Sequence, residues 1–160
     1  MDTSRRSPNL LKIVRDIADF QFGRGVGGKL FPDECRVEVS KRTGRPRYVY
    51  LGEELLATIR YPDNLIALSL EGARRLRSAL GENAPRAVVR REAVDKVLNG
   101  LNLAPRDISF CSPSIRPGDE VVIEDEDGRI LAVGRAVVSA QTMMGLSRGT
   151  AVKLRRILKT

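Results

Sequence analysis

Histidine is absent from this 160-residue chain, and only two cysteines, Cys35 and Cys111, are present. Histidine is the side chain that most often acts as a general base, and it activates serine or cysteine in nucleophilic sites. The two cysteines form no C-x-x-C motif, so the usual ligand set of a zinc site is also missing. We therefore predict that the chain is not an enzyme and needs no metal or cofactor.

Long apolar runs are also absent. No apolar stretch nears 18 residues, and residues 1–9 are polar, so we expect neither a membrane span nor a signal peptide. This pattern predicts a cytoplasmic protein with no membrane partner. Inside cells buried thiols stay reduced by default, although a disulfide between Cys35 and Cys111 is possible.

Positively charged residues outnumber negatively charged ones in this sequence. The formal net charge is +8, and the excess of Lys and Arg is spread over both halves of the chain. Such an excess favours polyanionic partners such as nucleic acid, although it can also serve solubility alone. Arginine far outnumbers lysine, which suits bidentate phosphate contacts. With four Phe and three Tyr, we expect extended base stacking to be minor.

The periodicity of apolar residues predicts helices mixed with short strands. Residues 10–20 place apolar side chains on one helix face, and a second helix is expected over 71–80. Between these helices, β-prone segments separated by turns predict strands over 36–40, 48–51, 55–60 and 65–70. We therefore predict an α+β fold, with a first domain over residues 1–84.

The second half has its own pattern. The turn-rich residues 81–85 mark the boundary, and a strand at 86–89 and a short helix at 92–98 follow it. Short apolar strands then alternate with Pro-Gly and Asp-Gly turns from Ile115 to Arg156. This pattern predicts a small β-barrel, and hence a second domain over residues 85–160.

Three local motifs allow more than one interpretation. Gly23, Gly25 and Gly28 satisfy G-x-G-x-x-G, but a helix precedes them and Pro32 follows. We therefore expect a flexible connection between helix and strand rather than a dinucleotide loop. A third option is that Arg24 and Lys29, next to exposed backbone amides, contact a phosphate. The acidic residues 124–127 end in Asp-Gly, which indicates a solvated hairpin turn. A basic hairpin tip is either solvated or bound to RNA; it comprises Lys41, Arg42, Arg45 and Arg47.

Six ordered motifs of the second half resemble the PUA domain, an RNA-binding module of pseudouridine synthases and archaeosine transglycosylases. They are Ala87-Val88-Val89, Asn99-Gly100, Leu103-Ala104-Pro105, Ile115-Arg116-Pro117-Gly118-Asp119-Glu120-Val121, Leu131-Ala132-Val133-Gly134-Arg135-Ala136 and Gly149-Thr150-Ala151-Val152-Lys153. This resemblance implies a β-pseudobarrel with a short helix.

The first half resembles the segment before the PUA domain in archaeal tRNA-guanine transglycosylases. This resemblance rests on residues 18–25, Leu30-Phe31, Thr43-Gly44-Arg45 and residues 70–76. The whole chain therefore resembles the C-terminal part of that enzyme without its catalytic barrel. In that family this part binds tRNA, and the PUA module engages the acceptor stem.

The PUA resemblance also implies which residues bind RNA. The family uses its short helix, the loop after it and the last strand, where period-2 alternation puts Lys153 and Arg155 opposite Val152 and Leu154. Where the family often has Gly after the loop proline, this chain has Arg106-Asp107, and we expect Asp107 to repel phosphate while Arg106 compensates. The predicted RNA-binding residues are Arg90, Arg91, Lys96, Asn99, Gly100, Leu103, Ala104, Pro105, Arg106, Lys153 and Arg155.

These observations predict a non-catalytic protein that binds structured RNA, with tRNA as the expected partner, in support of tRNA modification. Two alternatives stay open at this point. The chain could be an accessory subunit that holds tRNA for a separate modification enzyme, or a ribosome-associated or assembly factor that binds rRNA.

Overall fold

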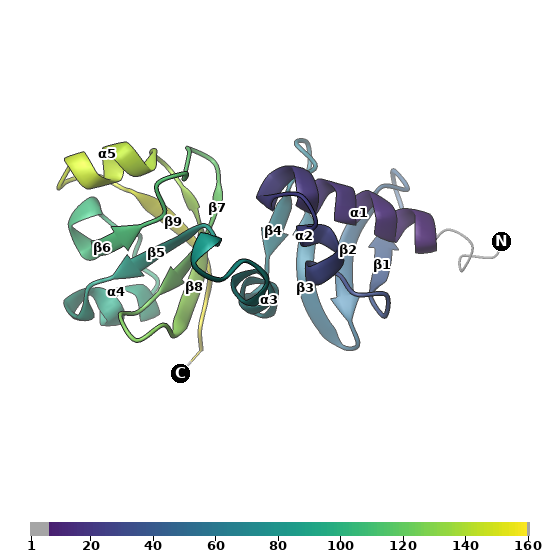
Figure 1. Ribbon diagram of the computed structural model, residues 1–160, viewed down its shortest axis with the longest axis horizontal. Coiled ribbons are helices and arrows are strands. Elements are labelled where there is room, and N and C mark those ends of the chain that lie inside the picture. Colours follow the sequence, from purple (N-terminus) through teal and green to yellow (C-terminus); the bar gives the residue numbers. More distant parts are fainter. Residues whose placement is uncertain (1–6, 160) are drawn as a thin grey trace. The chain divides into compact units, whose positions relative to one another are not determined.

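The computed structural model describes residues 7–159 and separates into two units, Met1–Gly81 and Glu82–Thr160 (Figure 1). Each unit combines helices with its own β-sheet, which confirms the predicted α+β class. No helix within residues 7–159 is long and apolar enough to cross a membrane. The first unit contains α1 (Ser7–Phe22), α2 (Val26–Leu30), β1 (Arg36–Val39), β2 (Pro46–Leu51), β3 (Glu54–Ile59), β4 (Ile66–Leu68) and α3 (Leu70–Leu80).

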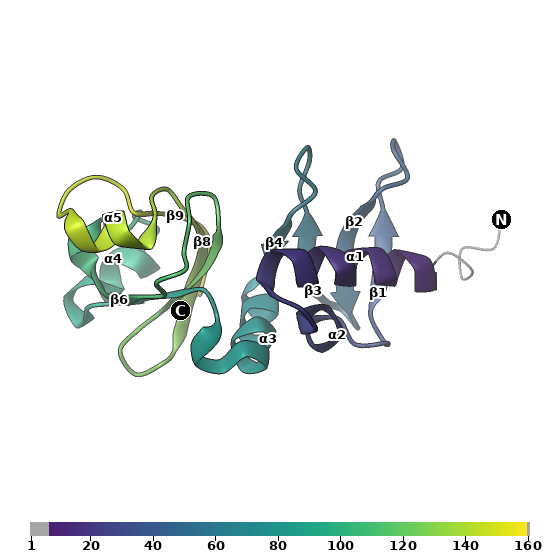
Figure 2. The ribbon, with the colours of Figure 1, turned by 45° about the horizontal axis from the view of Figure 1, so that its top comes forward.

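The first sheet is an antiparallel meander in the order β1-β2-β3-β4. A row of cross-strand partners runs over it, because Val37 pairs with Val49, Val49 with Ala57, and Ala57 with Leu68. All four are buried, since alternation puts every second side chain on the same face. Helix α1 lies across the strands and contacts β1, β2 and β4 (Figure 2).

The glycine-rich run forms an ordered joint rather than the flexible connection predicted. Helix α2 begins within the run, at Val26, and packs so tightly on α1 that a Cβ on Gly27 would lie 2.2 Å from the Arg15 carbonyl oxygen. Asp19 fixes this approach, because its Oδ1 accepts a hydrogen bond from Gly27 N at 2.7 Å. A helix, not a strand, precedes the run, so the context of a dinucleotide loop is missing.

The second unit is built on a five-stranded sheet in the order β6-β5-β7-β8-β9, in which β5 and β7 are parallel and the other neighbours antiparallel. Its core gathers buried residues of all five strands, and α4 packs on β8 and β9. The elements are β5 (Arg86–Val89), α4 (Val94–Leu98), β6 (Ile108–Cys111), β7 (Glu120–Glu124), β8 (Ile130–Ala136), α5 (Ala140–Gly145) and β9 (Val152–Ile157).

The sequence analysis did not predict two of these elements, β6 and α5. Helix α5 has only six residues, and Ser139 caps it by accepting a hydrogen bond from Thr142 N at 3.2 Å. Ser139 was therefore the local sequence signal for the start of this helix, but six residues are too few to show a helical pattern of apolar side chains. Strand β6 covers four residues and ends at Cys111, and Ser112 follows it, with its Oγ accepting from Arg86 N at 3.0 Å.

The acidic segment is only partly a solvated turn. The β7–β8 hairpin forms as predicted, with Asp125 Oδ1 accepting from Arg129 N at 2.9 Å. Glu124, however, is 1% exposed, and its Oε1 lies 3.3 Å from Nη1 of Arg86. Arg86 also stacks on the Phe110 ring, 4.8 Å from its centroid. Glu124 is thus a buried ion-pair partner, and the prediction of a solvated side chain there is wrong.

Both cysteines are free thiols. Cys35 lies in the first unit and Cys111 in the second, and burial raises the pKa of each. A raised pKa keeps the thiols protonated and weakly reactive at neutral pH.

Candidate nucleic-acid interface

The end of α4 sets the path of the loop after it. Leu101 N donates to Lys96 O at 3.1 Å and Gly100 N to Val97 O at 2.9 Å, which is the hydrogen-bond pattern of a Schellman motif. Gly100 has φ +82°, a conformation that a side chain at this position would strain. The sequence Asn99-Gly100 therefore ends the helix sharply and starts the predicted RNA-binding loop.

This loop is paired to the last strand. Leu103 N donates to Val152 O at 3.0 Å, and Ala151 N donates to Leu103 O at 2.7 Å. Asn102 extends the contact, because its Oδ1 accepts from Leu154 N at 3.0 Å. The structure thereby brings the predicted loop beside Lys153, which is exposed between these two contacts.

Asp107 does not point outward as the sequence suggested. Its side chain is 12% exposed, and Oδ2 accepts from Ala104 N at 2.8 Å and from Lys96 Nζ at 2.6 Å. The carboxylate therefore anchors the loop and offsets the charge of Lys96 instead of repelling phosphate at the surface. Beside it, Arg90 Nε donates to Arg106 O at 3.0 Å, and both arginines are exposed. The four residues share a shallow pocket of ≈ 200 Å³ with Glu92 and Ala93.

The last strand departs from strict alternation at Arg155. Leu154 pairs with Gly134 and Arg156 with Val133, so Arg155 is an extra residue in a bulge. Arg155 forms an ion pair with Glu120, whose side chain is 1% exposed. Its charge is therefore engaged inside the domain, and we leave Arg155 out of the candidate surface.

Arg135 was missed by sequence reasoning. It is exposed on β8 and is the cross-strand partner of Lys153, so the two cations lie side by side. No local signal identifies it, because only the strand register brings the two positions together.

The remaining predicted residues differ in their exposure and in the charge of their surroundings. Leu103 and Pro105 are buried, so they shape the loop without exposing a side chain, whereas Asn99 and Gly100 are exposed and Ala104 is half-buried. Arg91 is exposed but borders a pocket with Asp125, Glu126 and Asp127 in its wall. These carboxylates would repel RNA, so we leave Arg91 out as well. No cluster of acidic residues or cysteines suited to a metal ion occurs in residues 7–159.

We define the cationic surface of the second unit by its exposed basic residues and the contacts that join them. Arg90 and Arg106 lie at one end, next to the partly neutralised Lys96. The loop of residues 99–104 links them to Lys153 and Arg135 at the other end. A polyanion crossing this surface would meet positive charge at both ends and an uncharged loop between them, with Asp107 turned inward and Glu92 beside the Arg90 end.

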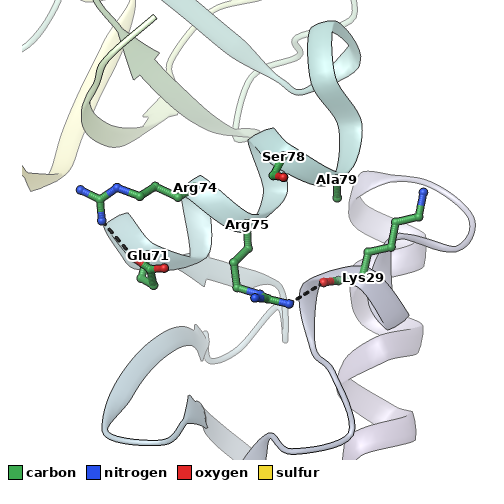
Figure 3. Close-up of a pocket in the computed structure, with 6 residues that line it drawn as sticks. All are labelled: Lys29, Glu71, Arg74, Arg75, Ser78 and Ala79. Atoms are coloured by element: carbon green, nitrogen blue, oxygen red, sulfur yellow. Dashed lines mark hydrogen bonds and ion pairs between the residues drawn. The ribbon is translucent and has the colours of Figure 1, made fainter.

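A basic pocket of ≈ 520 Å³ lies between α2 and α3 in the first unit (Figure 3). Arg75 spans it and donates from Nε to Leu30 O at 3.0 Å and from Nη2 to Lys29 O at 2.9 Å. It thereby caps the C-terminal carbonyls of α2. Arg74 is held by Glu71 at 3.0 Å. Because both arginines serve the fold, this pocket is a weaker candidate than the cationic surface.

Comparison with known proteins decides the family. Residues 12–83 match the model of the patch-forming domain C2 of tRNA-guanine transglycosylase, and residues 85–158 match the model of the PUA domain. Residues 85–158 of the chain are a PUA domain. Its resemblance to the segment before PUA plus the PUA domain of tRNA-guanine transglycosylases is thereby confirmed.

Curated relatives extend this match along most of the PUA-domain protein. It is 41% identical over 143 residues to the tRNA-guanine(15) transglycosylase of Methanothermobacter thermautotrophicus, covering 89% of this chain and 22% of that protein. It is 40% identical over 148 residues to the tRNA-guanine(15) transglycosylase of Pyrococcus furiosus, covering 92% and 25%. The PUA-domain protein therefore spans about a quarter of the length of these relatives.

Solved structures show the same fold. A hypothetical protein from Pyrococcus horikoshii superposes with a TM-score of 0.75 at 24% identity, covering 94% of this chain and 91% of that chain. A conserved PUA domain protein from Thermoplasma acidophilum gives a TM-score of 0.62 at 20% identity, covering 94% and 89%. These likenesses confirm the predicted order of a small α+β unit followed by a PUA fold.

Proposed function

We propose that this PUA-domain protein binds tRNA through the cationic surface and catalyses no reaction itself. The observation that carries the proposal is the presence of two exposed basic pairs, Arg90 with Arg106 and Arg135 with Lys153, which the loop of residues 99–104 connects. Exposed arginines and lysines neutralise phosphates and release counterions, which supplies affinity. Structured RNA is then selected by the shape of its backbone. The tRNA in the names of the curated relatives favours it over other structured RNAs.

The test compares neighbouring arginines that differ in surroundings. Filter binding of purified protein to labelled tRNA is measured from low to physiological salt. Replacing Arg90 and Arg106 together with Gln should weaken binding and reduce the log–log salt slope by about 2, because two phosphate contacts are lost. Arg91→Gln is the matched control, because it removes the same kind of side chain beside the acidic turn and should leave the slope unchanged.

Three results would contradict all or part of the proposal. An absence of tRNA binding by the wild-type protein at low salt would remove it altogether. Preferential cross-linking to rRNA in the native host would show that the RNA partner is rRNA and not tRNA. Turnover of tRNA by the pure protein would contradict the non-catalytic part.

A second candidate, favoured by the length of the relatives, is an accessory subunit. The matched transglycosylases carry about three quarters of their sequence outside the part that this chain matches. We propose that a separate catalytic chain uses this protein to hold tRNA. Co-purification of a modification enzyme with the tagged protein, and a lower KM for tRNA when the two are mixed, are the expected results. An unchanged KM in the mixture would argue against it.

A further inference from the structure

The first sheet separates charge along its strands. Because the sheet is a meander, the β1–β2 and β3–β4 turns project from the same end (Figure 2). These turns carry Arg42, Arg45 and Arg60. The opposite end carries Glu53 in the β2–β3 turn and Glu54 at the start of β3, both exposed. Asp63 in the second turn is paired with Arg60, so a polyanion approaching this unit is directed mainly to the β1–β2 turn at this end.

A pocket of ≈ 260 Å³ lies between these two turns. None of the described residues that line it is acidic. This volume lies below the roughly 300–1,000 Å³ of typical ligand pockets, so the pocket suits one phosphate with its adjoining sugar or base better than a large molecule. We call it the turn pocket, and it is lined by Ser40, Arg42, Thr43, Arg45, Pro46, Arg47, Ile59, Arg60, Tyr61 and Asn64.

Arg60 supplies donors that the described residues leave unused. Its side chain is 15% exposed, and Nη2 lies 3.1 Å from Oδ2 of Asp63. Nε and Nη1 are buried and have no hydrogen-bond partner within residues 7–159. Buried donors without partners are costly, so an anionic oxygen in the pocket would remove that cost. Arg60 thus lines the pocket with a guanidinium that one carboxylate holds and whose other nitrogens have no partner in the described part of the chain, and such a group binds phosphate well.

The walls of the pocket are held in place before any ligand arrives. In the first turn, Ser40 N donates to Arg45 O and Gly44 N to Ser40 O, both at 2.8 Å. In the second turn, Asn64 N donates to Arg60 O at 2.8 Å, and Leu65 N donates to Asp63 Oδ1 at 3.0 Å. Preorganised loops lose little conformational freedom on binding, which favours a specific contact over a loose one.

Tyr61 adds a flat apolar face to the same pocket. It is 76% exposed, although large aromatic side chains are usually buried. Beside it, Arg42 and Arg45 are exposed and form no ion pair with the described residues. An aromatic ring next to free guanidinium groups is the arrangement that binds a stacked base and its phosphate. One such ring also agrees with the low aromatic content of the chain.

We propose that the turn pocket binds one unpaired nucleotide of the RNA, with its phosphate on Arg60, Arg42 and Arg45 and its base stacked on Tyr61. This inference rests on the proposed RNA-binding function and adds a second contact, located in the first unit. The cationic surface recognises backbone shape, whereas the turn pocket requires a nucleotide that is free to leave a helix.

Binding of the full chain to labelled tRNA over a salt series tests this pocket with exposed substitutions. Tyr61→Ala should weaken binding about tenfold and Tyr61→Phe less than about twofold, because stacking needs the ring and not the hydroxyl. Replacing Arg42 and Arg45 together with Gln should lower the salt slope by about 2. Arg36→Gln is the control, because Arg36 is exposed on the same sheet at its acidic end and should bind like the wild type.

A cross-linking measurement accompanies the variants. Ultraviolet irradiation of the wild-type complex, followed by mass spectrometry, should recover a nucleotide on the peptide that contains Tyr61. Wild-type affinity and slope in the Tyr61→Ala and Arg42/Arg45 variants, with weaker binding after loss of Arg90 and Arg106, would overturn the turn pocket and leave the proposed function standing. A wild-type protein that binds no RNA would overturn both. Circular dichroism confirms that each variant is folded.

Discussion

Asp107 is the residue whose role changed most between sequence and structure. Its carboxylate accepts hydrogen bonds from Ala104 N and Lys96 Nζ. It therefore orders the loop and at the same time offsets the positive charge of Lys96. Asp107→Asn should keep an oxygen for Ala104 but release Lys96. We expect the free energy of unfolding to fall by about 1–2 kcal/mol, because a charge-assisted contact is lost. We also expect tRNA affinity and the salt slope to rise, since one more cation becomes available. Urea unfolding and filter binding measure the two effects.

Asp95→Asn is the control for this substitution. Asp95 is exposed on α4, the short helix that carries Lys96, and borders the acidic pocket, so its substitution removes an equal charge without breaking the Lys96–Asp107 contact. Its unfolding free energy should change by less than about 0.5 kcal/mol. Weaker tRNA binding by Asp107→Asn would contradict the view that Asp107 restrains Lys96, and would indicate that loop order matters more than charge.

At the scale of elements, the joint between α1 and α2 depends on one missing side chain. A Cβ on Gly27 would lie 2.2 Å from the Arg15 carbonyl oxygen, whereas a Cβ on Gly28 would meet no atom within 4 Å. Gly27→Ala should therefore lower the free energy of unfolding by about 1–3 kcal/mol, as overpacking does in a tight core. Gly28→Ala, in the same short helix, should be neutral or stabilising by up to about 1 kcal/mol. Equal denaturation midpoints for the two variants would show that the helices can separate freely.

Most elements of this fold could be predicted because their signals are local. The β1–β2 hairpin and the β7–β8 hairpin follow from alternation next to turn residues, and Asn99-Gly100 marks the end of α4. Helices α2 and α5 have five and six residues, too few for a periodic pattern. The bulge at Arg155 also carries no local signal, because it depends on the register of β9 against β8.

The candidate site was predictable in the same partial way. Family motifs located the helix, loop and strand, and the structure brings these elements together. The charge of each residue depends on partners distant in sequence, which no local pattern reveals. Lys96 meets Asp107, Arg155 meets Glu120, and Arg91 borders the acidic turn. Three of the predicted cations are thereby weakened, while Arg135 is added through the strand register.

At the scale of the whole molecule, positive charge occurs on both units, and we propose that each contributes to RNA affinity. A chain of residues 82–160 contains a complete sheet and core, so we expect it to fold alone and unfold cooperatively. It should still bind tRNA through the cationic surface. Its salt slope should be smaller than that of the full chain by about 2 to 3, since Arg42, Arg45 and Arg60 are then missing.

Thermal unfolding followed by filter binding separates the possible results of this truncation. An unfolded fragment would show that the second unit needs the first, and a proposed domain boundary near residue 84 would then fail. A folded fragment with the affinity and slope of the full chain would mean that the first unit makes no RNA contact. A folded fragment with reduced slope, combined with a normal response to loss of Arg90 and Arg106, is the outcome expected if two separate basic sites bind one RNA. Affinity then rises more than either site provides, because the second contact forms at high effective concentration.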